Sequence, residues 1–200
     1  RNAGQTCVCT NRFFVHDRVY DAFAAKLVER VRALKVGPGT DPDTQLGPIN
    51  NKMQLERVMG LVDDAKRNGA KVEAGGVRLE GAGYFYPPTI VSNVGPGIRL
   101  VDEEQFGPAL PVIPYRDIDD VVERANATTF GLSGSVWSPD VERAGAVAER
   151  LECGTAWVNA HVALGPHQPF GGFKWSGLGV ENGPWGLAGF TELQVQYRAK

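Results

Sequence analysis

Hydrophobic positions repeat with helical spacing in two long segments of the first half of the chain. From Asp17, a plausible N-cap, apolar residues recur every three or four positions, and we expect them to form one buried helical face. These residues are Val19, Phe23, Leu27, Val31 and Leu34. A second segment runs from Asn50 or Asn51 to about Asn68, where Gly69 follows as glycine often does just past helix ends. Its expected inward positions are Leu55, Val58, Leu61, Val62 and Ala65.

Short apolar or alternating runs between the helical segments predict strands. They are residues 11–16, 71–74, 110–115, 133–137 and 155–159. Residues 84–94 also look extended, but Pro87 and Pro88 favour an edge or crossing segment over a central strand. Two later helices are expected, one capped by Asp117 and one beginning at residues 138–140 with Pro139 in its first turn. Strands that alternate with helices predict an α/β fold, with a largely parallel sheet flanked by helices.

The last regular pattern, over residues 190–197, alternates apolar and polar side chains like an exposed edge strand. An unpaired edge offers its backbone donors and acceptors to another chain. We therefore expect residues 1–188 to form the main domain and residues 189–200 to form an oligomerisation strand.

Composition narrows the class of protein. Hydrophobic residues make up 42% and charged residues 22%, which is ordinary for a folded domain. The net charge of −2 gives no reason to expect a nucleic acid or an anionic membrane as partner. No apolar run reaches the roughly 20 residues of a membrane-spanning helix, and no signal peptide is visible. Three cysteines, an odd number, favour a reducing compartment such as the cytoplasm over a disulfide framework.

The opening residues carry the main candidate for chemistry. Asn2 and Gln5 have the spacing of a capping box, which predicts a short helix from about Ala3. Cys7 would then lie in the first two turns, where a helix N-terminus favours the thiolate, the reactive form of cysteine. The alternative is a small buried hydrophobe, as most free cysteines are. Cys9 raises a redox hypothesis, but on a helix the two thiols point roughly 200° apart, so a disulfide would need local unwinding.

Two other groups of residues need an interpretation. Glu103 and Glu104 are either an acid–base pair or two solvated acids before a turn. His161 and His167, with Cys153 upstream, match no zinc spacing, so we expect a loop and no metal site there.

Three stretches, taken together, resemble the motifs of the aldehyde dehydrogenase superfamily. They are Asn2-x-Gly4-Gln5-x-Cys7, Glu103-Glu104-Gln105-Phe106-Gly107-Pro108 and Pro169-Phe170-Gly171-Gly172-Phe173-Lys174-x-Ser176-Gly177-x-Gly179. The resemblance covers essentially the whole chain. It implies oxidation of a small-molecule aldehyde to a carboxylic acid with NAD or NADP, through a thiohemiacetal and a thioester. It also implies a homodimer or homotetramer in which the C-terminal strand joins an intersubunit sheet.

The resemblance also implies residues for the nucleophile and the cofactor. Cys7 matches the catalytic nucleophile. Glu104 matches the acid that holds the ribose next to the nicotinamide, and a carboxylate suits vicinal hydroxyls because it accepts two hydrogen bonds. Phe106 matches the aromatic that packs beside the nicotinamide ring. Gln54 is expected near the cofactor.

Substrate contacts follow from the same resemblance. The loop before Phe170 lines the aldehyde tunnel, which makes His161, Leu164, His167 and Phe170 specificity candidates. The leading Arg1 resembles the semialdehyde dehydrogenase branch, where this arginine meets a substrate carboxylate. The tunnel loop departs from that branch, because residues 164–166 replace its serines.

The rival function is a cysteine hydrolase or acyltransferase in which Cys7 pairs with His161 or His167; a catalytically silent oligomerisation module is a third. The chain begins inside a motif and contains no Gly-x-Gly-x-x-Gly fingerprint. We therefore expect a fragment that lacks most of the cofactor domain and is inactive alone. The general base and the oxyanion amide would lie outside it, and neither Glu103 nor Glu104 is expected to be the base.

Overall fold

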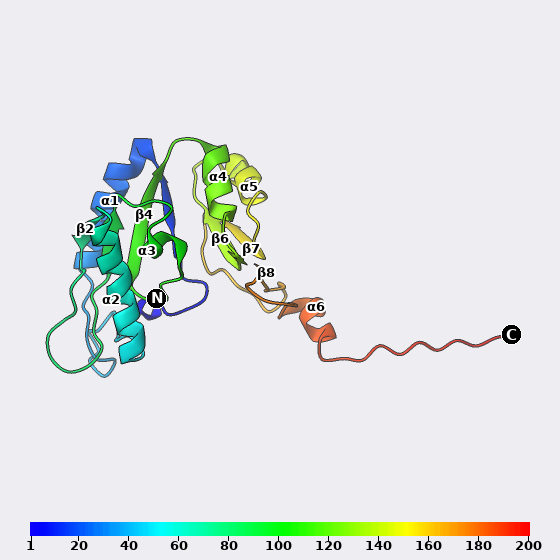
Figure 1. The fold of residues 1–200 in the computed structure, drawn as a ribbon. Coiled ribbons are helices and arrows are strands. Elements are labelled where there is room, and N and C mark those ends of the chain that lie inside the picture. The colour runs from blue at the N-terminus through cyan, green and yellow to red at the C-terminus, as the bar shows by residue number, and fades with distance from the viewer. The chain divides into compact units, whose positions relative to one another are not determined.

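The largest sheet has four strands in the order β1-β4-β3-β2, in a computed structural model that describes residues 1–200 (Figure 1). β1 (Phe13–His16) and β3 (Thr89–Ser92) both pair in parallel with β4 (Ala109–Tyr115). β2 (Lys71–Ala74) pairs with β3 in antiparallel orientation. The structure thus confirms an α/β fold with a mostly parallel sheet.

The position of β3 corrects one expectation from the sequence. β3 lies between β4 and β2, so residues 89–92 form a central strand and not an edge or crossing segment. Pro87 and Pro88 end just before the strand begins, so their missing N–H groups do not interrupt its hydrogen bonds. Thr89, the first residue of the strand, already donates its N–H to the Pro108 carbonyl, 2.7 Å away.

Helices cover both faces of this sheet. α2 (Lys52–Arg67) and the short α3 (Arg99–Asp102) pack on the face that presents Val91 and Ile113. α1 (Asp17–Arg32) packs on the opposite face, which presents Ile90 and Val112. Neighbouring strand residues therefore point to opposite faces, as the period of two requires.

The second predicted helix is confirmed in its cap and in its buried face. The Asn51 side chain accepts a hydrogen bond from the Gln54 N–H, and Gly69 follows the helix with a φ of 86°. The buried residues of α2 are the predicted Leu55, Val58, Leu61, Val62 and Ala65.

The first helix differs from its prediction. His16, not Asp17, is the N-cap, and its Nδ1 accepts a hydrogen bond from the Arg18 N–H. The packed face is also rotated: it presents Tyr20, Leu27, Val28 and Val31 to the sheet. The predicted inward residues Val19 and Phe23 are exposed on the helix, and Leu34, also exposed, lies beyond the end of the helix at Arg32.

By its internal packing the chain divides into two compact units, Arg1–Val121 and Val122–Lys200. In the second, β6 (Ser133–Val136) pairs in parallel with β7 (Thr155–Val158), and β5 (Phe130–Gly131) pairs antiparallel with β8 (Phe173–Lys174). α4 (Ile118–Asn126), which crosses the boundary, is capped by Asp117 as predicted, since its Oδ1 accepts from the Asp120 N–H. α5 (Val141–Ala148) and α6 (Gly183–Ala188) complete the helices.

The start of α5 corrects a further detail. Asp140 is the N-cap, and its carboxylate accepts a hydrogen bond from the Arg143 N–H at 3.0 Å. Pro139 therefore precedes the helix and does not lie in its first turn. The carboxylate can satisfy a free N–H of the first turn, and this sets the start of the helix.

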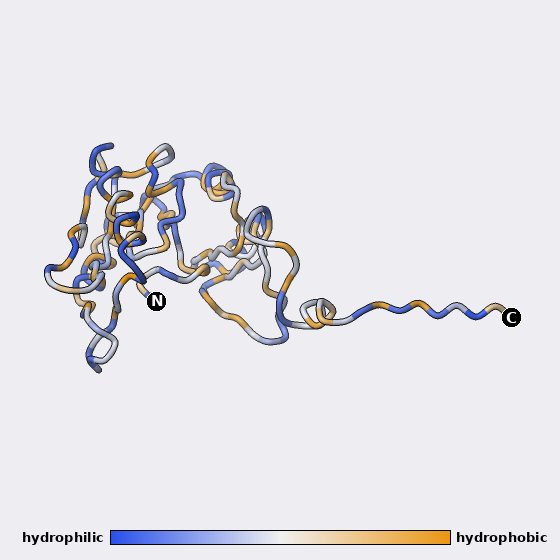
Figure 2. The backbone as a smooth tube through the Cα atoms, turned by 60° about the horizontal axis from the view of Figure 1, so that its bottom comes forward, coloured by the Kyte–Doolittle hydropathy of each residue, from blue (hydrophilic) through white to orange (hydrophobic).

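The C-terminal arm is neither helix nor strand. Residues 191–200 run outward with alternating hydropathy (Figure 2), and Phe190, Leu193, Val195 and Tyr197 are almost fully exposed. The predicted edge strand is thus absent in the single chain, because a strand without a neighbour has no ladder of hydrogen bonds to hold it. Pairing of this arm with another chain stays a prediction. None of the helices combines the length and apolarity that crossing a bilayer demands.

The buried face of α2 gives a test of the fold. Leu61 is 1% exposed in the core, so Leu61→Ala should lower the free energy of unfolding by about 2–5 kcal/mol through lost burial and a new cavity. Urea unfolding measures this difference. Met53→Ala is the matched control on the same helix, because Met53 is 75% exposed and should change stability little. Equal effects of the two substitutions would contradict this packing of α2.

Candidate active site

Cys7 lies in a tight turn and not in a helix. The preceding η1 turn (Asn2–Gly4) has φ values of 47°, 51° and 73° at its three residues, which is the left-handed region. A right-handed helix cannot pass through such residues. Instead, the Cys9 N–H donates to the Thr6 carbonyl at 2.9 Å and closes a turn around Cys7. The predicted helix is therefore wrong, and a helix N-terminus offers no reason here for a more reactive thiolate.

The predicted capping box does not form, and the side chains of Asn2 and Gln5 make other hydrogen bonds. The Asn2 side chain donates to the Gln5 carbonyl instead of accepting from its N–H. The Gln5 amide reaches the segment before α2: it donates to the Pro48 carbonyl at 3.3 Å and accepts from the Asn50 N–H at 2.7 Å. Gln5 therefore ties the Cys7 segment to the start of α2.

The three thiols are all free, and their surroundings differ. Cys7 is exposed, which excludes the buried-hydrophobe alternative. Cys9 is half-buried, and its Sγ lies 3.6 Å from the Arg1 carbonyl. Burial raises the pKa of Cys153, so its thiolate forms less readily. Cys7 is thus the most accessible nucleophile of the three.

The main chains of two distant segments meet beside Cys7. A Cβ atom added at Gly4 would collide with the Gly107 carbonyl, and one added at Gly107 would collide with the Val58 side chain of α2. Glycine is required at both positions for this close approach. The Cys7 segment therefore packs directly on the loop that contains Glu104 and Phe106.

This loop alternates between buried and outward side chains. Gln105 is 1% exposed, and its Nε2 donates to the carbonyls of Asn11 (3.0 Å) and Ala109 (2.8 Å). Its neighbours are turned the other way: Glu104 is exposed and Phe106 is half-buried. The structure therefore presents the two predicted cofactor residues together, on the loop next to the Cys7 segment.

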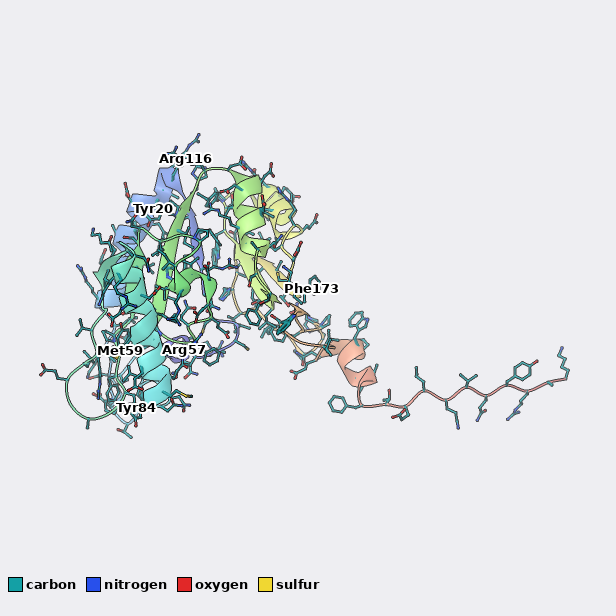
Figure 3. All side chains as sticks on the ribbon, in the orientation of Figure 1. Tyr20, Arg57, Met59, Tyr84, Arg116 and Phe173 are labelled. Carbon is teal, nitrogen blue, oxygen red and sulfur yellow. The ribbon has the colours of Figure 1, made fainter.

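Gln54 and Arg57 of α2 hold the backbone of the same loop; Arg57 is labelled in Figure 3. The Gln54 Nε2 donates to the carbonyls of Gln105 (2.8 Å) and Phe106 (2.9 Å). The Arg57 Nη2 donates to the Glu104 carbonyl at 2.9 Å. The sequence interpretation missed both Arg57 and Gln105, because no local pattern marks a side chain whose partners lie far away in the chain.

Glu103 is occupied by two arginines. Its carboxylate accepts hydrogen bonds from Arg99 at 2.6 Å and from Arg57 at 3.2 Å. The hydrogen bond from Arg99, supported by the charges of Arg99 and Arg57, lowers the pKa of Glu103. An ion-paired carboxylate with a lowered pKa is a poor general base.

The remaining predicted residues belong to the second unit, except Arg1, which is exposed at the start of the first. His161 packs edge-on against Trp157 with 5.1 Å between ring centroids, and the Trp157 indole donates to the Ala163 carbonyl. Phe170 exchanges two backbone hydrogen bonds of 2.8 Å with Glu181. Leu164 and His167 are exposed on the loop between them. The unit therefore supports the predicted substrate loop at both ends.

Comparison with known proteins decides the family. Residues 1–195 match the Aldehyde dehydrogenase family. This chain belongs to that family. It is 40% identical to an aldehyde dehydrogenase of Enchytraeus buchholzi over 196 residues, and these aligned residues cover 98% of this chain and 39% of the relative. It is 42% identical to a probable succinate-semialdehyde dehydrogenase [NADP(+)] of Sinorhizobium fredii over 194 residues, and these aligned residues cover 97% of this chain and 40% of the relative.

Solved aldehyde dehydrogenase structures have the same fold. The NAD+ complex of the Bacillus cereus enzyme aligns with a TM-score of 0.91 at 38% identity, over 95% of this chain and 39% of that one. Succinate-semialdehyde dehydrogenase from Burkholderia pseudomallei also has a TM-score of 0.91, at 44% identity over 94% of this chain and 39% of that one. The chain thus spans about two fifths of the length of these relatives. Nothing in these comparisons favours a cysteine hydrolase or acyltransferase.

Thiol reactivity tests the placement of Cys7. Brief treatment with iodoacetamide should label Cys7 first, because it is exposed, whereas Cys153 is half-buried with a raised pKa. Peptide mass spectrometry over a time course measures the three rates. Labelling of Cys153 before Cys7 would contradict the exposed turn.

Proposed function

We propose that this chain carries the nucleophile of an NAD(P)-dependent aldehyde dehydrogenase that oxidises an aldehyde to a carboxylic acid. One observation carries the proposal: an exposed, free Cys7 lies in a turn whose segment packs on the loop that presents Glu104 and Phe106. Membership of the aldehyde dehydrogenase family supports it. So do the similar proteins, which include a probable NADP(+) enzyme and an NAD+ complex.

The residues of the loop fit a nicotinamide nucleotide. The exposed Glu104 carboxylate can accept two hydrogen bonds, which suits the vicinal hydroxyls of a ribose. The half-buried Phe106 ring offers an apolar face to a planar ring. Both side chains are fixed outward by the buried Gln105 between them. We propose that Glu104, Phe106 and Gln54 belong to the part of the NAD or NADP site contributed by this chain, with Glu104 and Phe106 offering their side chains to the cofactor.

The thiol steps follow from the chemistry of Cys7. Its thiolate attacks the aldehyde carbon, a C–S bond forms, and the carbonyl electrons move to oxygen to give a thiohemiacetal oxyanion. The Cys7 N–H donates no hydrogen bond within the chain, so it can donate to this oxyanion. When NAD or NADP is bound, it supplies the acceptor for the hydride that leaves this carbon, and a thioester remains on Cys7.

Hydrolysis of the thioester completes the cycle. Water attacks the acyl carbon while a base takes its proton, the C–S bond breaks, and the carboxylic acid leaves as the thiolate is restored. Glu103 is paired with Arg99 and Arg57, and Glu104 is assigned to the cofactor. We therefore propose that the base and the second oxyanion donor, a side-chain amide, come from a part of the enzyme outside these residues.

Substrate selection is proposed for the loop of the second unit and for Arg1. Leu164 is 47% exposed and Phe170 is half-buried, so both can offer apolar surface to an aldehyde, and His161 lies at the start of the loop. The exposed Arg1 guanidinium suits a substrate carboxylate. Two of the similar proteins bear the name succinate-semialdehyde dehydrogenase, which supports this assignment of Arg1.

The intact enzyme is proposed to be larger than these residues and oligomeric. The relatives are about two and a half times as long as the matched region, which leaves room for most of the cofactor contacts. On this proposal the 200 residues alone show no turnover. Residues 1–188 form the catalytic domain, and residues 189–200 pair as a strand in a homodimer or homotetramer. Three free thiols fit a cytoplasmic enzyme.

Removal of the nucleophile tests the function. In the intact enzyme, Cys7→Ser should lower aldehyde-dependent NAD(P)H formation by at least about 10³-fold, because the thioester route is lost. The absorbance of the reduced nicotinamide measures the rate. Cys153→Ser is the matched control and should keep the activity. Undiminished turnover in Cys7→Ser would refute the proposal, and acyl-ester hydrolysis without any aldehyde oxidation in the parent would favour the hydrolase.

The assignment of Glu104 has its own test. Glu104→Gln should raise the KM for NAD(P) about tenfold, since an amide oxygen is a weaker acceptor for ribose hydroxyls than a carboxylate. Steady-state kinetics at saturating aldehyde measure it. Glu56→Gln on the exposed side of α2 is the control with the same change of charge. An unchanged KM in Glu104→Gln would remove Glu104 from the cofactor site.

A further inference from the structure

Three consecutive carbonyls of the proposed cofactor loop are held by one face of α2. Arg57 binds the carbonyl of Glu104, and Gln54 binds those of Gln105 and Phe106. Residues three apart lie on the same helical face, so these two side chains meet the loop together. Both N–H groups of the Gln54 amide are used in this way, which leaves only its oxygen for any ligand.

Gln105 holds the same loop from its inner side. Its buried Nε2 joins the carbonyl of Asn11, four residues after Cys7, to that of Ala109 at the start of β4. The main chain of Gln105 is bound by Gln54, and its side chain binds the segment of the nucleophile. The two glutamine amides therefore form a continuous connection from α2, through the loop, to the Cys7 segment.

Phe106 shows what this connection holds in place. Its φ of 46° lies in the left-handed region, which an L-residue with a large side chain adopts at an energetic cost. Such a conformation persists only where the surroundings fix it. The hydrogen bond from Gln54 to the Phe106 carbonyl acts directly at this residue, and the Asn51 cap fixes the Gln54 backbone in turn.

We propose that Gln54 and Gln105 are positioning residues that keep Glu104 and Phe106 in register with Cys7. This inference rests on the proposed dehydrogenase function. Gln54 then acts on the cofactor through the loop and not through a direct contact of its amide hydrogens. Loss of either glutamine impairs the use of the cofactor and leaves the chemistry of the thiol intact.

The experiment compares Gln54→Met with Gln54→Glu in the intact enzyme. Met has a similar length and no donor. Glu has nearly the same shape as Gln, but its ionised carboxylate only accepts, so it faces the two loop carbonyls with a repulsive charge. If the Gln54 loop contacts matter, Gln54→Glu should raise the KM for NAD(P) more than Gln54→Met does. If Gln54 instead contacted ribose hydroxyls directly, Gln54→Glu should raise this KM less than Gln54→Met, because a carboxylate can still accept from hydroxyl groups. The order of the two variants therefore separates positioning from direct binding.

We expect Gln54→Met to raise the KM for NAD(P) about tenfold, the effect of about two ordinary hydrogen bonds, and Gln54→Glu to raise it further. The rate of Cys7 alkylation by iodoacetamide without cofactor should stay within about twofold of the parent. Gln45→Met is the matched control: it removes an exposed amide that accepts from the Lys35 N–H, and it should change neither quantity.

Gln105→Leu provides an independent arm. It preserves the size of the buried side chain but frees the carbonyls of Asn11 and Ala109, and the KM for NAD(P) should again rise. Combined with Gln54→Met, it should raise KM by less than the product of the two single effects, because both variants release the same loop. Should Gln105→Leu fail to fold, the Gln54 pair tests the proposal by itself.

Three outcomes would overturn the inference. The first is an unchanged KM for NAD(P) in Gln54→Met. The second is a smaller rise of this KM in Gln54→Glu than in Gln54→Met. The third is a fall in the rate of Cys7 alkylation and in the urea midpoint of these variants that parallels the change in KM. Failure of the function itself looks different, because the parent enzyme would then form no NAD(P)H with any aldehyde.

Discussion

The close approach of the Gly4 and Gly107 main chains is the constraint on which the candidate site depends. A side chain at Gly4 would push the Cys7 segment off the loop of Glu104 and Phe106. Beneath Gly107 lies Val58, a fully buried residue of the α2 core. The site is thus supported by apolar packing, and each buried aliphatic side chain of that core contributes about 1.5–3 kcal/mol relative to an exposed one.

The register of the sheet explains how one buried amide can reach two distant carbonyls. β1 and β4 run in parallel with Phe13 beside Val112, so the residues before β1 lie beside the first residues of β4. Asn11 and Ala109 therefore come within reach of Gln105. Both site segments precede their strands, so this part of the site lies at the amino ends of β1 and β4. Open α/β sheets more often bind ligands beyond the carboxyl ends of their strands.

The charged side chains around the loop restrain its backbone and contribute little to the stability of the fold. The exposed ion pairs of Glu103 with Arg99 and Arg57 each contribute little to folding, because water and salt screen them. Their effect is to keep Glu103 ionised and occupied, while Arg57 also binds the Glu104 carbonyl. Two adjacent acids thereby acquire different environments: Glu103 is paired with arginines, and Glu104 is exposed.

Sequence alone determined the features that depend on near neighbours. The cap and buried face of α2, the strands β1, β2, β4, β6 and β7, the Asp117 cap and the three family motifs were readable, since apolar period and capping chemistry act over a few residues. Tertiary structure decided the rest. The spacing of Asn2 and Gln5 suggested a helix, but residues 2–4 form a left-handed turn in which Gly4 packs on the Gly107 main chain. The roles of Gln54 and Gln105 were equally hidden, because their amides bind carbonyls about 50 and 90 positions away in the chain. A local pattern cannot specify a hydrogen bond whose partner is fixed only when the sheet and α2 pack together.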